Sequence, residues 1–306
     1  TNTASNWTPE RAREIRRLAE IKGDAAQGEM VYRRSSLQCA VCHAIGGVGG
    51  KVGPDMTSLG ASAPVDYIIE SLFDPDAKIK ENYHSVTVLT EDGQVVSGIE
   101  TGSNDEEMVL IDASGKTIRI PEAEVAQVKP GKSLMPAALL DRVSEQDQLD
   151  LIRFLTRLGK PGDYDASRQT VARVLEVFAG THRIEQLGNQ SIISGERTQG
   201  WKPLQARVSG KIERETLEKL TAPPRNISLV NIYLRTQIEA GSETSASFHV
   251  DSLDQATYWI DGQNPTSIDK PATLTPGRHT LLIRIDARDL PESITIRSED
   301  VSFVAK

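Results

Sequence analysis

Cysteine is scarce in this sequence of 306 residues, which contains only Cys39 and Cys42. Because both lie in one short segment, a framework of structural disulfides is excluded. Histidine is also rare, with five in the chain. The four outside position 43 are scattered singly: His84, His182, His249 and His279.

Aromatic residues make up 5% of the chain, and no apolar run approaches the length of a membrane span. The basic residues form no stripe and the formal net charge is −8, which argues against a nucleic-acid partner. The charge instead predicts a partner that presents positive charge. The hydrophobic and charged fractions are typical of globular domains, and the length predicts two or three of them.

The two cysteines belong to the segment CAVCH at 39–43. Two thiols three positions apart on one helical turn suit the two vinyl groups on the edge of a haem, and the histidine that follows can bind the iron. The spacing C-x-x-C-H therefore predicts one covalently attached haem c, with iron as its metal.

Two other kinds of site also use paired cysteines. A structural zinc ion needs four ligands, whereas this chain has no second pair of cysteines or histidines. A redox dithiol of the thioredoxin type follows a strand and opens a helix, whereas this motif follows a helical stretch and precedes the glycine-rich loop 46–53. The haem interpretation is favoured over both.

Helical periodicity appears in four stretches of the first half of the chain: 9–21, 24–34, 64–73 and 146–158. Thr8 and Pro9 mark the start of the first stretch, and Ser144 with Asp147 caps the last. Before the last helix, residues 83–128 change to alternation with tight turns, which predicts four or five short strands in a small β-barrel.

The segment 159–163, GKPGD, breaks the helical pattern as a linker. Strand patterns then follow at 171–178, 227–238, 244–250, 256–261, 279–286 and 293–303. One short helix is expected at 214–220. Strands at this spacing predict a β-sandwich.

Five motifs, in this order and spacing, resemble those of the class I cytochromes c: GDAAQGE at 23–29, CAVCH at 39–43, GPDM at 53–56, LMP at 134–136 and DLIRFL at 150–155. The strand-rich insert, with TEDGQV at 90–95 and SLMP at 133–136, is more closely similar to the haem-binding domain at the end of large planctomycete and verrucomicrobial membrane-associated dehydrogenases. The resemblance covers about residues 22–160.

This resemblance implies a multi-domain α+β chain, with an all-α cytochrome c fold that carries an inserted small β-barrel, followed by an all-β, jelly-roll-like sandwich. The tail is similar to galactose-binding-like modules. The expected domains are a helical lead (1–22), a haem domain (23–160, with the barrel at 83–130), a linker (161–167) and the sandwich (168–306).

The resemblance also implies the haem-binding residues. Cys39 and Cys42 hold the haem, and His43 is the proximal iron ligand. The Pro54 carbonyl accepts the imidazole hydrogen bond, and Met135 supplies the distal sulfur. Four residues are expected to bring the first and last helices together over the haem: Gly28, Tyr32, Leu151 and Phe154.

The distal ligand has three alternatives, which are Met56, His84 and an open site. A methionine is more often a core residue than a metal ligand. Met135 is favoured because Pro136 stiffens its loop and because the closing helix follows.

Several aromatic residues have two interpretations. Tyr32, Tyr67 and Tyr83 are candidates to hydrogen-bond a haem propionate or the axial sulfur, although a core position is the more common role of such residues. Trp201 and Trp259 are expected in the sandwich core, or, as an exposed pair, stacked on a sugar ring.

A haem held between a histidine and a methionine has no open position for a substrate, so the chain is expected to transfer electrons and not to be an enzyme. The alternatives are a haem enzyme or sensor with a displaceable distal ligand, and a carbohydrate or cell-surface binding module with an accessory haem. The expected partners are a redox protein with a basic face or a dehydrogenase, with a carbohydrate as a candidate ligand of the C-terminal domain.

Haem attachment to C-x-x-C-H takes place outside the cytoplasm. We therefore expect an export signal upstream of Thr1 and a periplasmic or otherwise exported protein.

Overall fold

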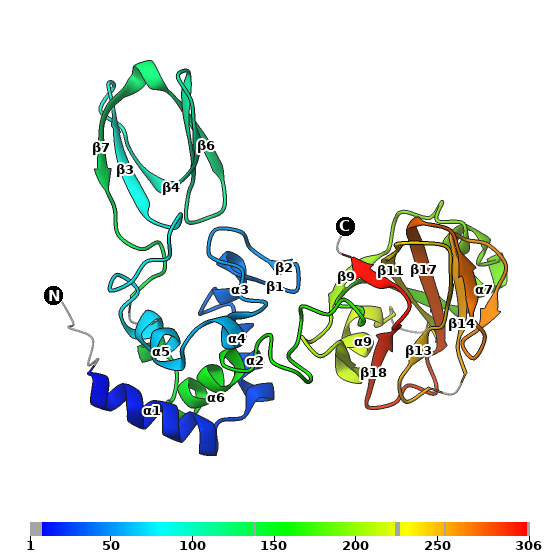
Figure 1. The fold of residues 1–306 in the computed structure, drawn as a ribbon. Helices are drawn as coiled ribbons and strands as arrows, with labels where there is room; N and C mark the ends of the chain where they lie inside the picture. Colours follow the sequence, from blue (N-terminus) through cyan, green and yellow to red (C-terminus); the bar gives the residue numbers. More distant parts are fainter. Residues whose placement is uncertain (1–7, 138, 224–226, 254, 305–306) are drawn as a thin grey trace. The chain divides into compact units, whose positions relative to one another are not determined.

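The structure, a computed structural model, describes residues 8–137, 139–223, 227–253 and 255–304. The chain divides into two compact units (Figure 1). The first unit comprises the chain up to Ala166 apart from Gly46–Val48, and the second begins at Ser167. This division falls within the predicted linker 161–167.

All four helices expected in the first half of the chain are present: α1 (Pro9–Lys22), α2 (Ala25–Tyr32), α5 (Val65–Phe73) and α6 (Glu145–Leu155). The Thr8 hydroxyl caps α1 by accepting from the N–H of Arg11, and the Ser144 hydroxyl caps α6 by accepting from the N–H of Asp147. Shorter helical segments lie between them: α3 (Cys39–Cys42), α4 (Leu59–Ser62), η1 (Glu122–Glu124) and η2 (Leu140–Arg142).

Helices α2 and α6 cross at close range because a glycine lies at the contact. A Cβ at Gly28 would lie 1.9 Å from the carbonyl oxygen of Asp150 and 2.7 Å from the Cβ of Phe154. One turn further on, the rings of Tyr32 and Phe154 are 5.7 Å apart, and Leu151 is buried. Only a residue without a side chain permits this approach.

The insert forms one antiparallel sheet in the order β6-β5-β4-β3-β7. Its small core joins Val88, Met108, Leu110 and Ile120. The strands of the small β-barrel predicted for 83–130 are present, but β6 and β7 are not paired with each other, so their sheet is open between these two strands. The strands are β3 (Ser85–Thr90), β4 (Val95–Ser103), β5 (Glu107–Ile111), β6 (Thr117–Pro121) and β7 (Val125–Pro130).

The second unit is built on a seven-stranded sheet in the order β15-β14-β17-β11-β8-β9, with β19 also paired to β11. Its strands are β8 (Val174–Thr181), β9 (Lys202–Gln205), β11 (Leu229–Ala240), β14 (Thr257–Ile260), β15 (Thr266–Ser267), β17 (Gly277–Asp286) and β19 (Ser302–Val304).

Two smaller sheets complete this unit. They are β10-β18-β13, made of Lys211–Glu213, Ser293–Arg297 and His249–Val250, and β12-β16, made of Thr244–Ala246 and Ala272–Leu274. Three short helices accompany them: α7 (His182–Leu187), α8 (Gln190–Ile193) and α9 (Arg214–Thr221).

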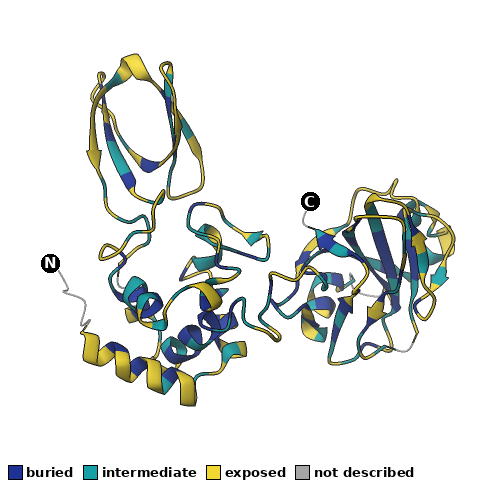
Figure 2. Ribbon diagram, viewed as in Figure 1, coloured by how far each residue is buried: buried dark blue, intermediate teal, exposed yellow. Residues whose placement is uncertain are grey.

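Many residues along the strands of the seven-stranded sheet are buried (Figure 2), and the apolar ones form clusters on both of its faces. Leu234 of β11 and Ile283 of β17 belong to the main core, together with Ile294 of the smaller sheet. The neighbouring residues Tyr233 and Leu282 belong to a separate cluster, since successive side chains of a strand point to opposite faces. A core between sheets agrees with the β-sandwich expected for the tail.

The predicted fold class is nevertheless wrong for the first unit. The structure is mostly β, with 33% strand and 25% helix. The first unit is not an all-α domain, because the five-stranded sheet β3–β7 belongs to it. Directly after α3, the strands β1 (Ala44–Ile45) and β2 (Val48–Gly49) also pair with each other. Among the described residues, no helix combines the length and the apolar character needed to span a membrane.

Candidate functional site

The segment CAVCH forms a single helical turn followed by extended chain. Gln38, at φ 56°, turns the chain into α3, and the N–H of His43 donates to the carbonyl of Cys39 at 2.9 Å. Cys39 and Cys42, three positions apart on this turn, are both half-buried free thiols. The turn therefore presents two thiols and one imidazole within five residues.

The imidazole of His43 is held by its main-chain surroundings. Its Nδ1 lies 2.8 Å from the carbonyl oxygen of Pro54, the contact implied by the resemblance. A Cβ at Gly53 would lie only 2.4 Å from the ring carbon Cε1, so the ring packs directly on the backbone there. Burial lowers the pKa of His43, and the bond to Pro54 opposes this shift. When the neutral ring carries its proton on Nδ1, the lone pair of Nε2 can bind a metal ion.

The glycine-rich loop expected at 46–53 is a hairpin that packs on the motif. The N–H groups of Gly50 and Gly53 donate to the carbonyls of Ala40 and Cys42, at 3.0 and 2.8 Å. A Cβ at Gly50 would lie 1.7 Å from the carbonyl oxygen of Val41. These glycines let the backbone close over α3, and they carry the loop to Pro54.

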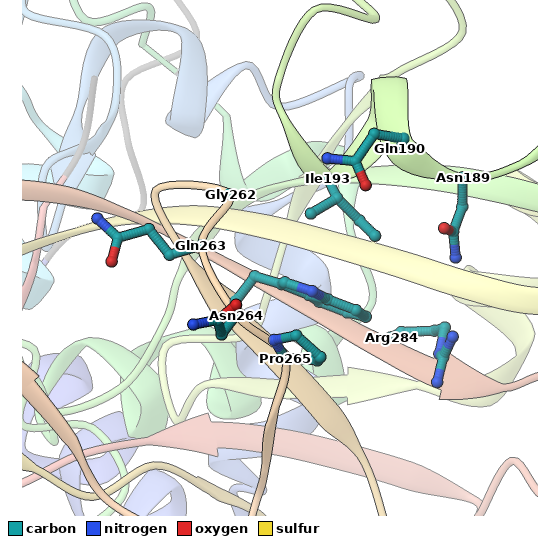
Figure 3. Close-up of a pocket in the computed structure, with 9 residues that line it drawn as sticks. Asn189, Gln190, Ile193, Gly262, Gln263, Asn264, Pro265 and Arg284 are labelled. Atoms are coloured by element: carbon teal, nitrogen blue, oxygen red, sulfur yellow. The ribbon is translucent and has the colours of Figure 1, made fainter.

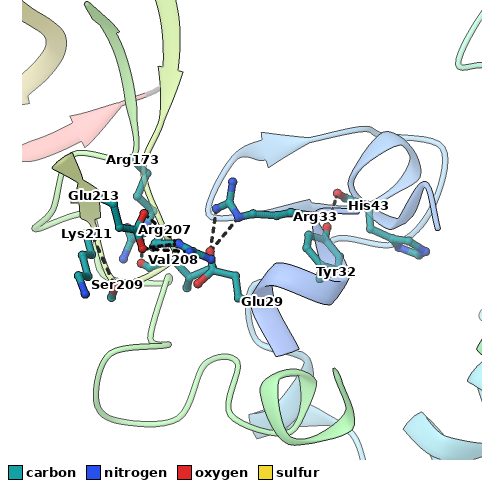
Figure 4. A network of polar contacts seen from close by, with 10 residues as sticks. All are labelled: Glu29, Tyr32, Arg33, His43, Arg173, Arg207, Val208, Ser209, Lys211 and Glu213. Atoms are coloured by element: carbon teal, nitrogen blue, oxygen red, sulfur yellow. Dashed lines mark hydrogen bonds and ion pairs between the residues drawn. The ribbon is translucent and has the colours of Figure 1, made fainter. Parts of the chain in front are cut away.

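Tyr32 has a role at the motif that the sequence did not reveal. Its hydroxyl donates to the carbonyl oxygen of His43 at 2.8 Å, and burial raises its pKa well above the usual range (Figure 4). In the same view the imidazole of His43 points away from Tyr32, and Arg33 pairs with Glu29 on α2. Helix α2 is thereby fixed to the backbone of the motif. In the sequence, the spacing of Gly28 and Tyr32 on one helical face indicated the helix crossing but not this hydrogen bond.

Burial raises the pKa of the Cys39 thiol to about 11 and also raises that of Cys42. An activated redox dithiol has a lowered thiol pKa, so these surroundings are unlike those of a thioredoxin-type site. Among the described residues, no group of three or more His, Cys, Asp or Glu side chains is placed to hold a metal ion. A zinc ion bound by Cys39, Cys42 and His43 would lack its fourth ligand.

The candidate distal ligands lie in different surroundings. Met135 is half-buried between β7 and η2, and its N–H donates to the hydroxyl of Ser133 at 3.2 Å. Met56 is buried, with its N–H bonded to the carbonyl of Ala44, as befits a core residue. His84 is exposed. These surroundings do not test which residue would be the second iron ligand, so the assignment of Met135 stays a prediction.

The other aromatic candidates are placed as follows. Tyr67 and Tyr83 are half-buried, the latter with Lys80 over its ring at 6.0 Å. Trp259 is 4% exposed and Trp201 is half-buried, so they do not form the exposed pair considered for sugar stacking.

The chain matches no protein-family model, and a search of curated proteins finds no significant match.

Proposed function

We propose that this chain carries one covalently attached haem c and transfers single electrons. The placement of His43 supports this proposal, because this residue directly follows the two cysteines of α3 and its Nδ1 is bonded to the Pro54 carbonyl. Cys39 and Cys42 would hold the haem as thioethers, and Nε2 of His43 would bind the iron. The donor set thus fits a haem of the c type.

When bound, the haem supplies reversible one-electron chemistry at its iron. The chain's own residues fix one of the iron ligands. The Pro54 carbonyl holds the proton on Nδ1 and keeps Nε2 free for the metal, and Gly53 leaves room for the ring against the backbone. Tyr32 ties the carbonyl of His43 to α2. Met135 is proposed as the second iron ligand.

If His43 and Met135 both held the iron, no position would be left for a substrate, so the proposed role is a relay and not an enzyme. We place this relay outside the cytoplasm, in the periplasm or an equivalent compartment. Its proposed partner is a redox protein with a basic docking face, or a dehydrogenase. Residues 83–130 support this, since they hold 9 acidic against 3 basic side chains, a net −6 within the total of −8.

A redox titration tests the relay. The purified protein should titrate reversibly as a single one-electron couple, and its reduced form should bind carbon monoxide slowly. Electron exchange with a basic redox protein should be fast at low salt and slow as ionic strength rises. Rapid carbon monoxide binding or efficient peroxide turnover would instead identify a haem enzyme or sensor.

The second ligand is tested by Met135→Ala. Loss of a neutral sulfur ligand should lower the reduction potential and remove the weak red absorption band of sulfur bound to ferric haem. Met30→Ala is the matched control, since Met30 is 42% exposed. If Met56→Ala or His84→Ala abolishes the band and Met135→Ala does not, the assignment of Met135 is wrong.

A further inference from the structure

The second unit has a polar pocket on the face of its seven-stranded sheet that lies away from the main core. Phe178, Tyr233, Trp259 and Leu282 form an apolar cluster on this face, and Ile192 of α8 packs on it. The pocket lies between α8 and the turn that follows β14 (Figure 3). Its volume of about 620 Å³ is within the range of small-molecule sites, roughly 300–1,000 Å³.

The turn at the pocket rim is held firmly. Gly262 has φ +71°, and a Cβ there would lie 2.7 Å from the carbonyl oxygen of Ile193, so the turn packs closely on α8. The preceding Asp261 accepts from the N–H of Thr280 at 2.7 Å and pairs with Nδ1 of His279 at 2.7 Å. The rim is therefore preformed, which reduces the entropic cost of binding.

Primary amides dominate the polar lining of the pocket. The amide of Asn189 donates to the hydroxyl of Tyr233 at 3.0 Å, and Tyr233 in turn donates to Glu185 at 2.8 Å. These two hydrogen bonds orient the side chain of Asn189 and leave its amide oxygen available. Three further amides surround the opening (Figure 3): Gln190, Gln263 and Asn264.

One charged side chain joins these amides. The guanidinium of Arg284 lies 5.5 Å from the centre of the Trp259 ring and donates to the hydroxyl of Thr257 at 3.3 Å. No carboxylate lines the pocket, and within the described part of the chain Arg284 forms no ion pair. The half-buried guanidinium thus has donors left for an anion.

We infer that this pocket binds a sugar that carries a carboxylate, such as a uronate. Each amide offers both donors and an acceptor, which matches sugar hydroxyls, since these also donate and accept. The planar fork of Arg284 matches a carboxylate. A phosphorylated ligand is less well matched, because only one cation faces the pocket. Trp259, although 4% exposed, supplies an apolar floor.

The inference is independent of the haem and is tested on the full chain by calorimetric titration. The probes are trigalacturonate, its full methyl ester, and acetate. The acid should bind, and the ester, which keeps the rings but loses the charges, should bind about tenfold more weakly or worse, since a charged hydrogen bond is lost. Acetate, which lacks hydroxyls, should also bind at least tenfold more weakly than the acid.

Two variants locate the binding. Arg284→Gln should weaken trigalacturonate about tenfold or more and leave the ester unchanged. Arg278→Gln, which alters an exposed arginine at the start of the same strand and outside the pocket, should have no effect. Absence of binding by the acid, equal binding of acid and ester, equal binding of acid and acetate, or an unchanged affinity in Arg284→Gln would each overturn the inference.

Discussion

The candidate site of the first unit depends on close backbone approach at several glycines, whereas the pocket of the second unit has such a glycine, Gly262, at its rim and otherwise rests on a large apolar core. Around the motif, Gly28, Gly50 and Gly53 each lie where a Cβ would collide with a neighbouring segment. In the second unit, fully buried side chains such as Phe248 and Tyr233 support the sheet beneath the pocket.

This difference predicts opposite sensitivities. The first unit should be damaged most by atoms added at its glycines, because there is no room at the helix crossing or beside His43. The second should be damaged most by atoms removed from its core, because a cavity remains that the surrounding sheets do not fill.

The largest effect is expected for Phe248→Ala. Phe248 is fully buried, and its ring lies 5.2 Å from that of Tyr258, so its loss should cost about 3–5 kcal/mol of unfolding free energy. Calorimetry together with the fluorescence of Trp201 and Trp259 should show that the second unit alone is destabilised. An equal loss of unfolding free energy in the first unit would contradict the expected difference between the two units.

The next effect is expected for Gly28→Ala, which places a methyl group 1.9 Å from the carbonyl oxygen of Asp150. Forcing α2 from α6 should cost about 1–3 kcal/mol in the unfolding transition of the first unit, measured by circular dichroism. Gly102→Ala is the matched control, because a Cβ there meets nothing within 4 Å. Equal stability of the two variants would show that the crossing tolerates a side chain.

The sequence predicted much of what is local. The four helices of the first unit appear close to their expected bounds, because their periodicity and caps, such as Thr8 and Ser144, act within a few residues. The tail strands also appear, with β11 at Leu229–Ala240 against a predicted 227–238. The all-α expectation was wrong because four of the five motifs that carry the resemblance lie in or beside helices. The sheet of residues 83–130 was therefore taken as an insert, although it is a large part of the first unit.

The two candidate sites also differ in how far apart their residues lie in the sequence. The thiols and imidazole lie within residues 39–43, so the motif could be recognised from spacing alone. Asn189, Trp259 and Arg284 come from three separate elements, and only the pairing of β14 with β17 brings the last two together. No pattern of neighbouring residues in the sequence indicates such a pocket. The helices α7 and α8 beside it are too short to be predicted from periodicity.

The smallest effect is a pH dependence in the second unit. The bond to Asp261 raises the pKa of His279, and the contact with the Thr275 carbonyl adds to this shift. The charged form therefore stabilises the folded state fully below the unfolded-state pKa near 6.5, and this contribution is lost as pH rises through the higher folded-state value. We expect a loss of roughly 1 kcal/mol or less, because Asp261 is exposed.

Denaturant unfolding at pH 5.5 and 8.5 measures this loss. In the unfolding transition of the second unit, His279→Gln should reduce the difference between the two pH values, and His249→Gln, at an exposed position of β13, should keep it. An equal pH dependence in the wild-type protein and in His279→Gln would assign the effect to other groups.

The most direct test of the haem proposal is acid-acetone extraction of protein produced together with a c-type haem attachment system. The wild-type protein should keep one haem after extraction, and the double variant Cys39→Ala with Cys42→Ala should release all of it. Ser35→Ala, at an exposed position just before the motif, should behave as the wild type. A wild-type protein that loses its haem to the solvent, or that binds none, would contradict the proposal.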